Sequence, residues 1–411
     1  MSSPDPFGGM PFFGDLARMI GRQGPIAWDA ARQIAHSIAT DGQPEPNVDP
    51  LARIQLEQLA RVAELQIANA SGLDASHHGA GITITPVTRT QWVSRTLDDH
   101  RSLFESLAHS LGSSGTDAPG AAGGPVAPGS TPAVTDPTDL DPLDEDAATA
   151  WLGQLMGMLQ PMTLGMAAGS MVGHLATRSF GQYDLPVPRP PGDEVMVLVP
   201  AIDAFAEEWS LGVDDVRLWV CLHEVAHHAV LSVPHVRAEL TELIERFVAG
   251  FRPDPMGFER ALSDLDPADP SGLESVQRLF TDPEVLMGAT SSPAQDEVRP
   301  RLDSLVTAIA GWVDHVMDTV GGSLVGSYPQ VTEAMRRRRV ETGRADRFVE
   351  RLFGLNLTQA RFDLGASFVE GVVERAGEDG LARLWGRVED LPTPAELEAP
   401  GLWLARIDLD H

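Results

Sequence analysis

The residues best suited to chemistry lie in one short stretch, HEVAH, which runs from His223 to His227. Side chains four residues apart share one face of an α-helix, so His223 and His227 can present imidazole nitrogens to the same ion. Zinc accepts such nitrogens as ligands. Glu224 stands beside the first histidine, where a carboxylate can take a proton from a metal-bound water. The stretch therefore predicts a zinc site for hydrolysis, with His223 and His227 as ligands and Glu224 as general base.

Such a site needs a rigid helix to hold the two imidazoles. We expect this helix to begin near Asp214 and to end before Pro234, since proline breaks the hydrogen-bond pattern. Its apolar residues include Trp219 and Val230, which predict packing into a core. Upstream, the run EVMVLVPA at residues 194–201 is typical of a short strand. An exposed edge of such a strand could pair with an extended substrate.

The third zinc ligand is less obvious than the first two. The pattern H-E-x-x-H-x-x-G-x-x-H is excluded, because Val230 and Val233 stand at its glycine and last histidine positions. His228 points about 100° away from His227 on a helix, and His235 follows a proline, so neither is a natural ligand. Glu245 is expected to face solvent, opposite the apolar side of its own helix.

A better source is the stretch SLVTAIAGWVDHVMDTVGG, residues 304–322, which predicts a helix that is apolar nearly all round and therefore buried. Asp314 and His315 interrupt it. A buried carboxylate needs a partner because an unpaired buried charge is costly. Asp314 could bind the metal as third ligand or accept the second N–H of a ligating histidine. The alternative is that Asp314 forms a purely local ion pair or cap.

Several stretches together resemble a mainly actinobacterial family of zincin-like zinc metallopeptidases, some of whose members are labelled as associated with coenzyme F-four-twenty biosynthesis. The resemblance covers most of the chain: MPFFGDLARMIG, DVRLWVCLHEVAHH, GWVDHVMDTVGG, EAMRRRR, FVERLFGL and LPTPAELEAPGLWLARI. It implies a zincin-like core, zinc as cofactor and cleavage of a peptide bond. It also implies His223 and His227 as metal ligands and Glu224 as general base.

The chain departs from this family at one position. Relatives often carry Glu-Gly-x-x-Asp, which is similar to the gluzincin helix whose Glu is the third ligand and whose Asp supports a ligand histidine. Here the matching residues run from Ala310 to Asp314, so the Asp is kept and the Glu is replaced. Three interpretations are open: Asp314 takes over as ligand, another carboxylate arrives from elsewhere, or the site is degenerate. The last would make the protein a binding or scaffold protein with weakened or absent metal.

Along the chain, many helices and few strands predict a mainly α fold with a small β-sheet, of the α+β class. We expect an N-terminal helical segment at residues 1–111, a disordered linker or insertion rich in Gly, Pro and Asp at residues 112–146, and a zincin-like catalytic domain at residues 147–411. The glycines Gly165, Gly169 and Gly173 predict a buried helix with close contacts rather than a membrane span, which needs about 20 apolar residues.

Net charge, the N-terminal sequence and the cysteine count indicate the partners and the location that we expect for this protein. The formal net charge of −29 repels phosphate backbones, so we expect no nucleic-acid partner. The N-terminus lacks the pattern of a signal peptide, and the single cysteine, Cys221, forms no intramolecular disulfide, so we expect a cytoplasmic protein without membrane association. We expect Cys221 to be a buried thiol and the run Arg336–Arg339 to make ion pairs within the protein or at its surface. Neither the substrate nor the oligomeric state follows from the sequence.

Overall fold

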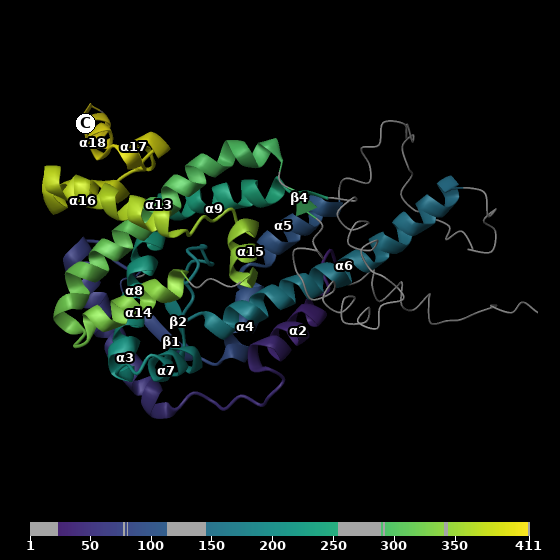
Figure 1. The fold of residues 1–411 in the computed structure, drawn as a ribbon, viewed down its shortest axis with the longest axis horizontal. Helices are drawn as coiled ribbons and strands as arrows, with labels where there is room; N and C mark the ends of the chain where they lie inside the picture. Colours follow the sequence, from purple (N-terminus) through teal and green to yellow (C-terminus); the bar gives the residue numbers. More distant parts are fainter. Residues whose placement is uncertain are drawn as a thin grey trace, which may run out of the picture.

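The computed structural model describes residues 24–76, 79, 81–112, 145–253, 289–290, 292–340 and 344–409. Helices surround a small sheet in this part of the chain (Figure 1). The elements nearest the candidate site are α6 (Glu145–Arg178), β2 (Glu194–Leu198), α8 (Val213–Ser232), α13 (Pro293–Leu324), α14 (Tyr328–Val340) and α16 (Gln359–Ala382). The predicted class, mainly α with a small β-sheet, is confirmed.

The remaining elements enclose this centre. Earlier in the chain than α6 come α2 (Trp28–Thr40), α3 (Pro50–Ser71), β1 (Thr83–Val87), α4 (Arg89–Asp99) and α5 (Arg101–Gly112). Later in the chain come α7 (Val199–Glu208), α9 (Pro234–Ala249), the short pair β3 (Arg252–Pro253) and β4 (Ala289–Thr290), α15 (Arg344–Leu352), α17 (Pro394–Glu398) and α18 (Pro400–Leu409). A capping box at Thr393 starts α17, as its sequence predicts.

Helix α8 lies in the middle of the molecule, where α3, α7, α9, α13 and α14 contact it (Figure 1). It begins after Gly212 with Asp214 and Asp215 in its first turn, where carboxylates favour the positive end of the helix dipole. It ends at Ser232, just before Pro234. From Val225 to Leu231 every residue is buried. Such enclosure gives the histidines of the motif a fixed backbone.

The sheet beside α8 has two parallel strands, β1 and β2, with Ile84 opposite Val195. A third segment joins the free edge of β2: Gly181 forms an antiparallel bridge with Val197, and the N–H of Leu198 donates to the carbonyl of Phe180 at 2.6 Å. The edge of β2 is therefore occupied by the chain itself. Strand β2 ends at Leu198, earlier than its apolar run suggests, because α7 begins at Val199 with Pro200 in its first turn.

The three glycines of α6 allow close approach to α2. A Cβ atom on Gly165, Gly169 or Gly173 would lie 2.6, 2.3 or 2.9 Å from the nearest backbone oxygen of α2 or the residue before it. The predicted role of these glycines in helix contact is confirmed. None of the described helices is long and apolar enough to span a membrane.

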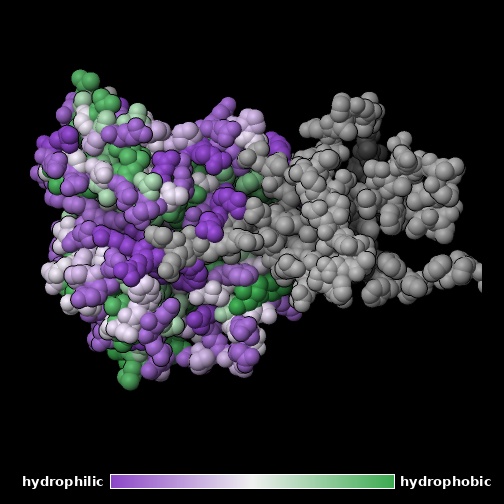
Figure 2. Space-filling view, in the orientation of Figure 1, coloured by the Kyte–Doolittle hydropathy of each residue, from purple (hydrophilic) through white to green (hydrophobic). Residues whose placement is uncertain are grey.

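One hydrophobic core contains residues from both sides of the predicted linker, from Ile26 to Ile407. Helix α2 packs along α6, and α3 packs on α8. The linker at residues 112–146 lies almost wholly outside the described residues, so the proposed division remains a prediction. On the face shown in Figure 2, hydrophilic residues predominate and hydrophobic residues form small separate groups, as expected of a chain with a net charge of −29.

Candidate functional site

The two motif histidines lie on one face of α8, with ring centroids 4.4 Å apart. Each is held by an aromatic neighbour: Trp219 stacks on His223 at 5.0 Å, and Tyr183 stacks on His227 at 6.1 Å. The Nδ1–H of His227 donates to the carbonyl of His223 at 3.1 Å, which leaves Nε2 of His227 as the nitrogen available to a ligand. The expectation that both imidazoles share a face holds.

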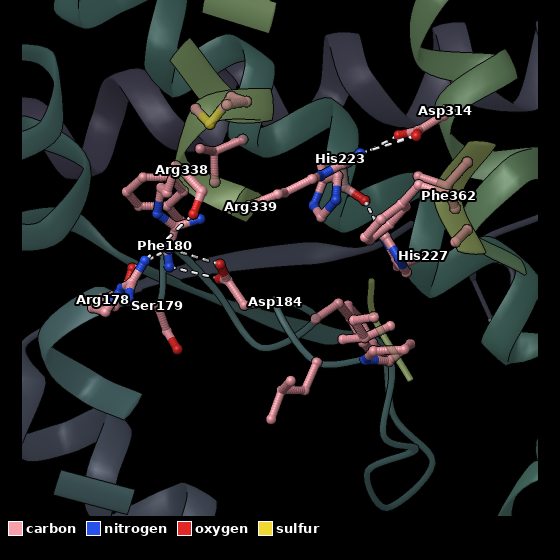
Figure 3. A pocket seen from close by; sticks show the side chains of 18 of the residues that line it. Arg178, Ser179, Phe180, Asp184, His223, His227, Asp314, Arg338, Arg339 and Phe362 are labelled. Atoms are coloured by element: carbon pink, nitrogen blue, oxygen red, sulfur yellow. Dashed lines mark hydrogen bonds and ion pairs between the residues drawn. The ribbon is translucent and has the colours of Figure 1, made fainter. Parts of the chain in front are cut away.

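A cavity of about 130 Å³ opens beside these rings (Figure 3). Its walls come from the end of α6 and the following segment, from α8, α13 and α14, and from α15, α16 and the segment between them. His223 and His227 line it, and Asp314 and Ala310 of α13 line it too. Helix α13 therefore faces the histidines with the side predicted to carry the third ligand.

Asp314 is engaged by a cation of the protein. Arg339 of α14 donates from both terminal nitrogens to the two carboxylate oxygens of Asp314, at 2.9 and 2.8 Å. Burial alone would raise the pKa of Asp314, but the Arg339 guanidinium lowers it below its ordinary value. In Figure 3 the Arg339 side chain extends alongside His223 to reach Asp314. The carboxylate is thus ionised and already paired.

Both imidazoles are neutral at pH 7. Burial lowers the pKa of His223 to about 4, and the charge of Arg339 adds to this effect. Burial also lowers the pKa of His227 well below its usual value, with further contributions from His223 and Arg339. Neutral imidazole is the form that binds a metal ion or accepts a hydrogen bond.

The charges around the cavity balance. Three arginines line it, Arg178, Arg338 and Arg339, and so do three carboxylates, Asp184, Asp314 and Glu350. Arg338 pairs with Asp184 at 3.0 Å and lies 3.8 Å above the ring of Phe180. A strongly anionic or cationic ligand would find no excess of opposite charge in this cavity.

Glu224 does not line the cavity. Its side chain is completely buried under the segment after α6, where Oε2 accepts the N–H groups of Gln182 at 2.8 Å and Tyr183 at 3.0 Å. Oε1 has no hydrogen-bond partner among the described residues and lies 3.7 Å from Nδ1 of His223. Burial raises the pKa of Glu224 well above its ordinary range, and Asp184 adds to the effect.

The segment over Glu224 is itself tightly held. Asp184 accepts the N–H groups of Phe180 and Gly181, and the indole N–H of Trp92 donates to the carbonyl of Gly181 at 2.8 Å. A Cβ on Gly181 would lie 2.3 Å from the Glu224 carboxyl carbon, so only glycine fits there. The N–H groups of residues 180–183 are all taken internally, and none is offered to an extended ligand.

The other residues weighed from the sequence lie elsewhere. Glu245 is exposed on α9, as expected, and His315 pairs with Glu378 on the surface at 3.1 Å. Cys221 is buried, and burial raises the pKa of its thiol. His228 bonds through Nδ1 with the hydroxyl of Tyr183 at 2.8 Å.

Two residues that line the cavity, Tyr183 and Arg339, were not predicted from the sequence as parts of the site. Tyr183 stands in the stretch GQYDLP, which looks like an ordinary loop, and no local periodicity marks it. Arg339 belongs to a run of four arginines for which ion pairs are expected, and Arg337, Arg338 and Arg339 do form them with Glu333, Asp184 and Asp314. The run gives no sign of which arginine reaches the cavity.

Comparison with known proteins shows which family the chain belongs to and which solved structure has a similar fold. The model of the zincin-like metallopeptidase family matches residues 26–404, and the chain belongs to that family. A search among curated proteins found no match. Among solved structures, the chain is similar to "a putative hydrolase with a novel fold" from Chloroflexus aurantiacus, with a TM-score of 0.61 and 23% identity over 93% of this chain and 99% of that one. This second likeness shows a shared fold.

The zinc that the family implies can be tested against the side chains present. His223 and His227 are suitable donors, but a catalytic zinc site takes three protein ligands. Ala310 has no donor atom, and Asp314 is paired with Arg339. Among the residues that the structure describes, no group of three histidine, cysteine or carboxylate side chains is arranged to hold a metal ion. As arranged, these residues do not fit a complete catalytic zinc centre.

Proposed function

We propose that this protein is a ligand-binding member of the zincin-like metallopeptidase family in which the zinc centre is incomplete. The observation that carries the proposal is Ala310, which lines the same cavity as His223 and His227 and has no donor atom. The neighbouring carboxylate, Asp314, is held by Arg339 instead of facing an open coordination position. The chain therefore combines the fold and cavity of a hydrolase family with two of three metal ligands.

The surroundings of Glu224 support the same proposal. A general base must come within hydrogen-bond reach of the attacking water. Glu224 instead accepts two backbone N–H groups beneath residues 181–183 and is absent from the cavity wall. The carboxyl group between the two motif histidines has a structural use here, because it anchors the segment that carries Tyr183.

The cavity favours a neutral ligand of modest size. Its volume of about 130 Å³ is close to the ~150 Å³ of an engineered cavity that holds benzene. Its formal charges cancel, and it offers neutral imidazoles as hydrogen-bond acceptors. We propose that a peptide ligand places one neutral side chain here, in keeping with the substrate class of the family.

Zinc-dependent cleavage of a peptide bond is the second candidate function. The observation in its favour is the pair His223 and His227, both neutral and both on the wall of one cavity. This candidate requires a third donor and a base that the described arrangement does not supply at the cavity.

The two candidates differ in the metal content of the purified protein. We expect the wild-type chain to hold far less than one zinc per molecule, and Ala310→Glu to hold much more, because it restores a donor facing both histidines. His223→Ala in the Ala310→Glu background is the matched control and should abolish that gain. Near one zinc in the wild-type chain, lost in His223→Ala, would instead support the hydrolase.

Trp219 offers a readout for the ligand. It lines the cavity and stacks on His223, so occupation of the cavity should change its fluorescence. Neutral aromatic and aliphatic peptides should alter the emission in a saturable way, and acidic or basic peptides of equal length should not. Equal responses from charged and neutral peptides would contradict the assignment of ligand class.

A further inference from the structure

Arg339 is fixed more firmly than a surface arginine. Its guanidinium is bidentate on Asp314 and lies 4.5 Å from the ring centre of Phe362. Only 22% of its side chain is exposed. Bidentate arginine–carboxylate pairs combine strong hydrogen bonds with a defined orientation. Stacking over an aromatic ring adds a cation–π contribution.

The helix that carries Arg339 is tied to the motif helix. Asp215, in the first turn of α8, accepts the N–H groups of Gly326 and Ser327 at 3.2 and 3.0 Å, just before α14 begins. It also accepts the hydroxyl of Ser327 at 2.5 Å. Further along α14, Arg338 pairs with Asp184. The position of Arg339 relative to His223 is therefore determined from both ends of α14.

The Arg339 guanidinium places a positive charge in the cavity lined by His223 and His227, the two residues expected to bind zinc in this family. Its charge acts on both His223 and His227, and its nitrogens bind the one carboxylate that lines the cavity from the buried α13 helix. A divalent ion bound to the two imidazoles and Asp314 would have to displace these hydrogen bonds. It would also meet the repulsion of a cation that cannot lose its charge, because arginine stays protonated in proteins.

We propose that Arg339 is the resident cation of this site and stands in place of a metal ion, with Asp314 as its partner. The inference rests on the proposed function and extends it, since it gives a second reason, beside the missing donor at position 310, why the two histidines do not hold zinc. As arranged, His223, His227 and Asp314 do not hold a metal ion. The inference predicts that removal of the Arg339 charge frees the Asp314 carboxylate to turn toward the two histidines.

The test is to remove the cation and titrate the full-length protein with zinc and cobalt. Arg339→Gln should bind one zinc at least tenfold more tightly than the wild-type chain, and its cobalt form should absorb in the visible range. Arg339→Gln combined with Asp314→Asn should lose this gain. Arg337→Gln is the matched control, because Arg337 lies on the same helix but pairs with the exposed Glu333. It should behave like the wild type.

The outcomes separate this inference from the proposed function. If neither the wild-type chain nor Arg339→Gln binds metal, the inference is overturned and the incomplete centre stands. If the wild type already holds one zinc, Arg339 does not stand in place of a metal ion, and the inference fails together with the proposed function. Equal affinity in all four proteins also overturns the inference.

A second variant guards against misfolding. Arg339→Met keeps the stem over Phe362 without the charge and should likewise gain metal affinity if Arg339→Gln does not fold. A folded Arg339→Met that binds no more zinc than the wild type would overturn the inference as well.

Discussion

Replacing Glu224 distinguishes a structural carboxylate from a catalytic one. Glu224→Ala leaves the buried N–H groups of Gln182 and Tyr183 without an acceptor. An unsatisfied buried donor costs about 1–3 kcal/mol, so the two together should lower the free energy of unfolding by about 2–6 kcal/mol. Glu224→Gln should be milder, with a loss of about 1–3 kcal/mol, because its amide nitrogen takes the buried position of Oε1, which has no hydrogen-bond partner among the described residues. Both N–H groups bond to the same oxygen, and an amide oxygen can accept both.

The assay is denaturant unfolding of the full chain, followed by far-ultraviolet circular dichroism. Glu245→Ala is the control, because Glu245 is exposed on α9 and its loss should change stability by no more than about 0.5 kcal/mol. A catalytic base would give the opposite pattern: little loss of stability in either Glu224 variant, and loss of function in both. If Glu224→Ala is as stable as the control, the account of residues 180–183 as an anchored segment is refuted.

Two further predictions concern the framework. Gly311→Ala should destabilise the protein by about 3 kcal/mol because its Cβ would lie 2.3 Å from the carbonyl of Gly365, whereas Gly322→Ala on the same helix meets nothing within 4 Å and should stabilise it by up to about 1 kcal/mol. Equal melting temperatures for the two would contradict the close crossing of α13 and α16. His100 has its pKa lowered to about 3 by burial and by Arg189, so it stays neutral in the folded state while it binds a proton in the unfolded state below pH 6.5. Between pH 7 and pH 5 the wild type should therefore lose up to about 2 kcal/mol of stability relative to His100→Gln, and equal acid sensitivity would contradict this.

Local pattern was enough to predict the motif helix. The spacing of His223 and His227 and the apolar residues around them depend only on the helical period, and the structure places both rings on one cavity wall. The burial of the helix around Asp314 followed from its apolar composition in the same way. Gly165, Gly169 and Gly173 predicted close helix contact because small residues at this spacing leave one face of a helix without side chains.

What the sequence could not predict depends on contacts between distant segments. Nothing near Glu224 indicates that the backbone N–H groups of residues 182 and 183, some forty positions earlier, donate hydrogen bonds to its side-chain oxygen. The pairing of Asp314 with Arg339 likewise depends on the turn between α13 and α14. The end of β2 is a smaller case: Val199 continues the apolar run, but Pro200 suits the first turn of a helix better than the interior of a strand.

The central claim is that this zincin-like chain lacks a complete zinc centre because position 310 offers no donor. The most direct measurement is the zinc content of the wild-type protein and of Ala310→Glu, each purified without chelators and then dialysed against excess zinc and buffer. The account predicts well under one zinc per chain for the wild type and close to one for Ala310→Glu. Close to one zinc in the wild type, lost on His223→Ala, would contradict it and make peptide hydrolysis the leading function.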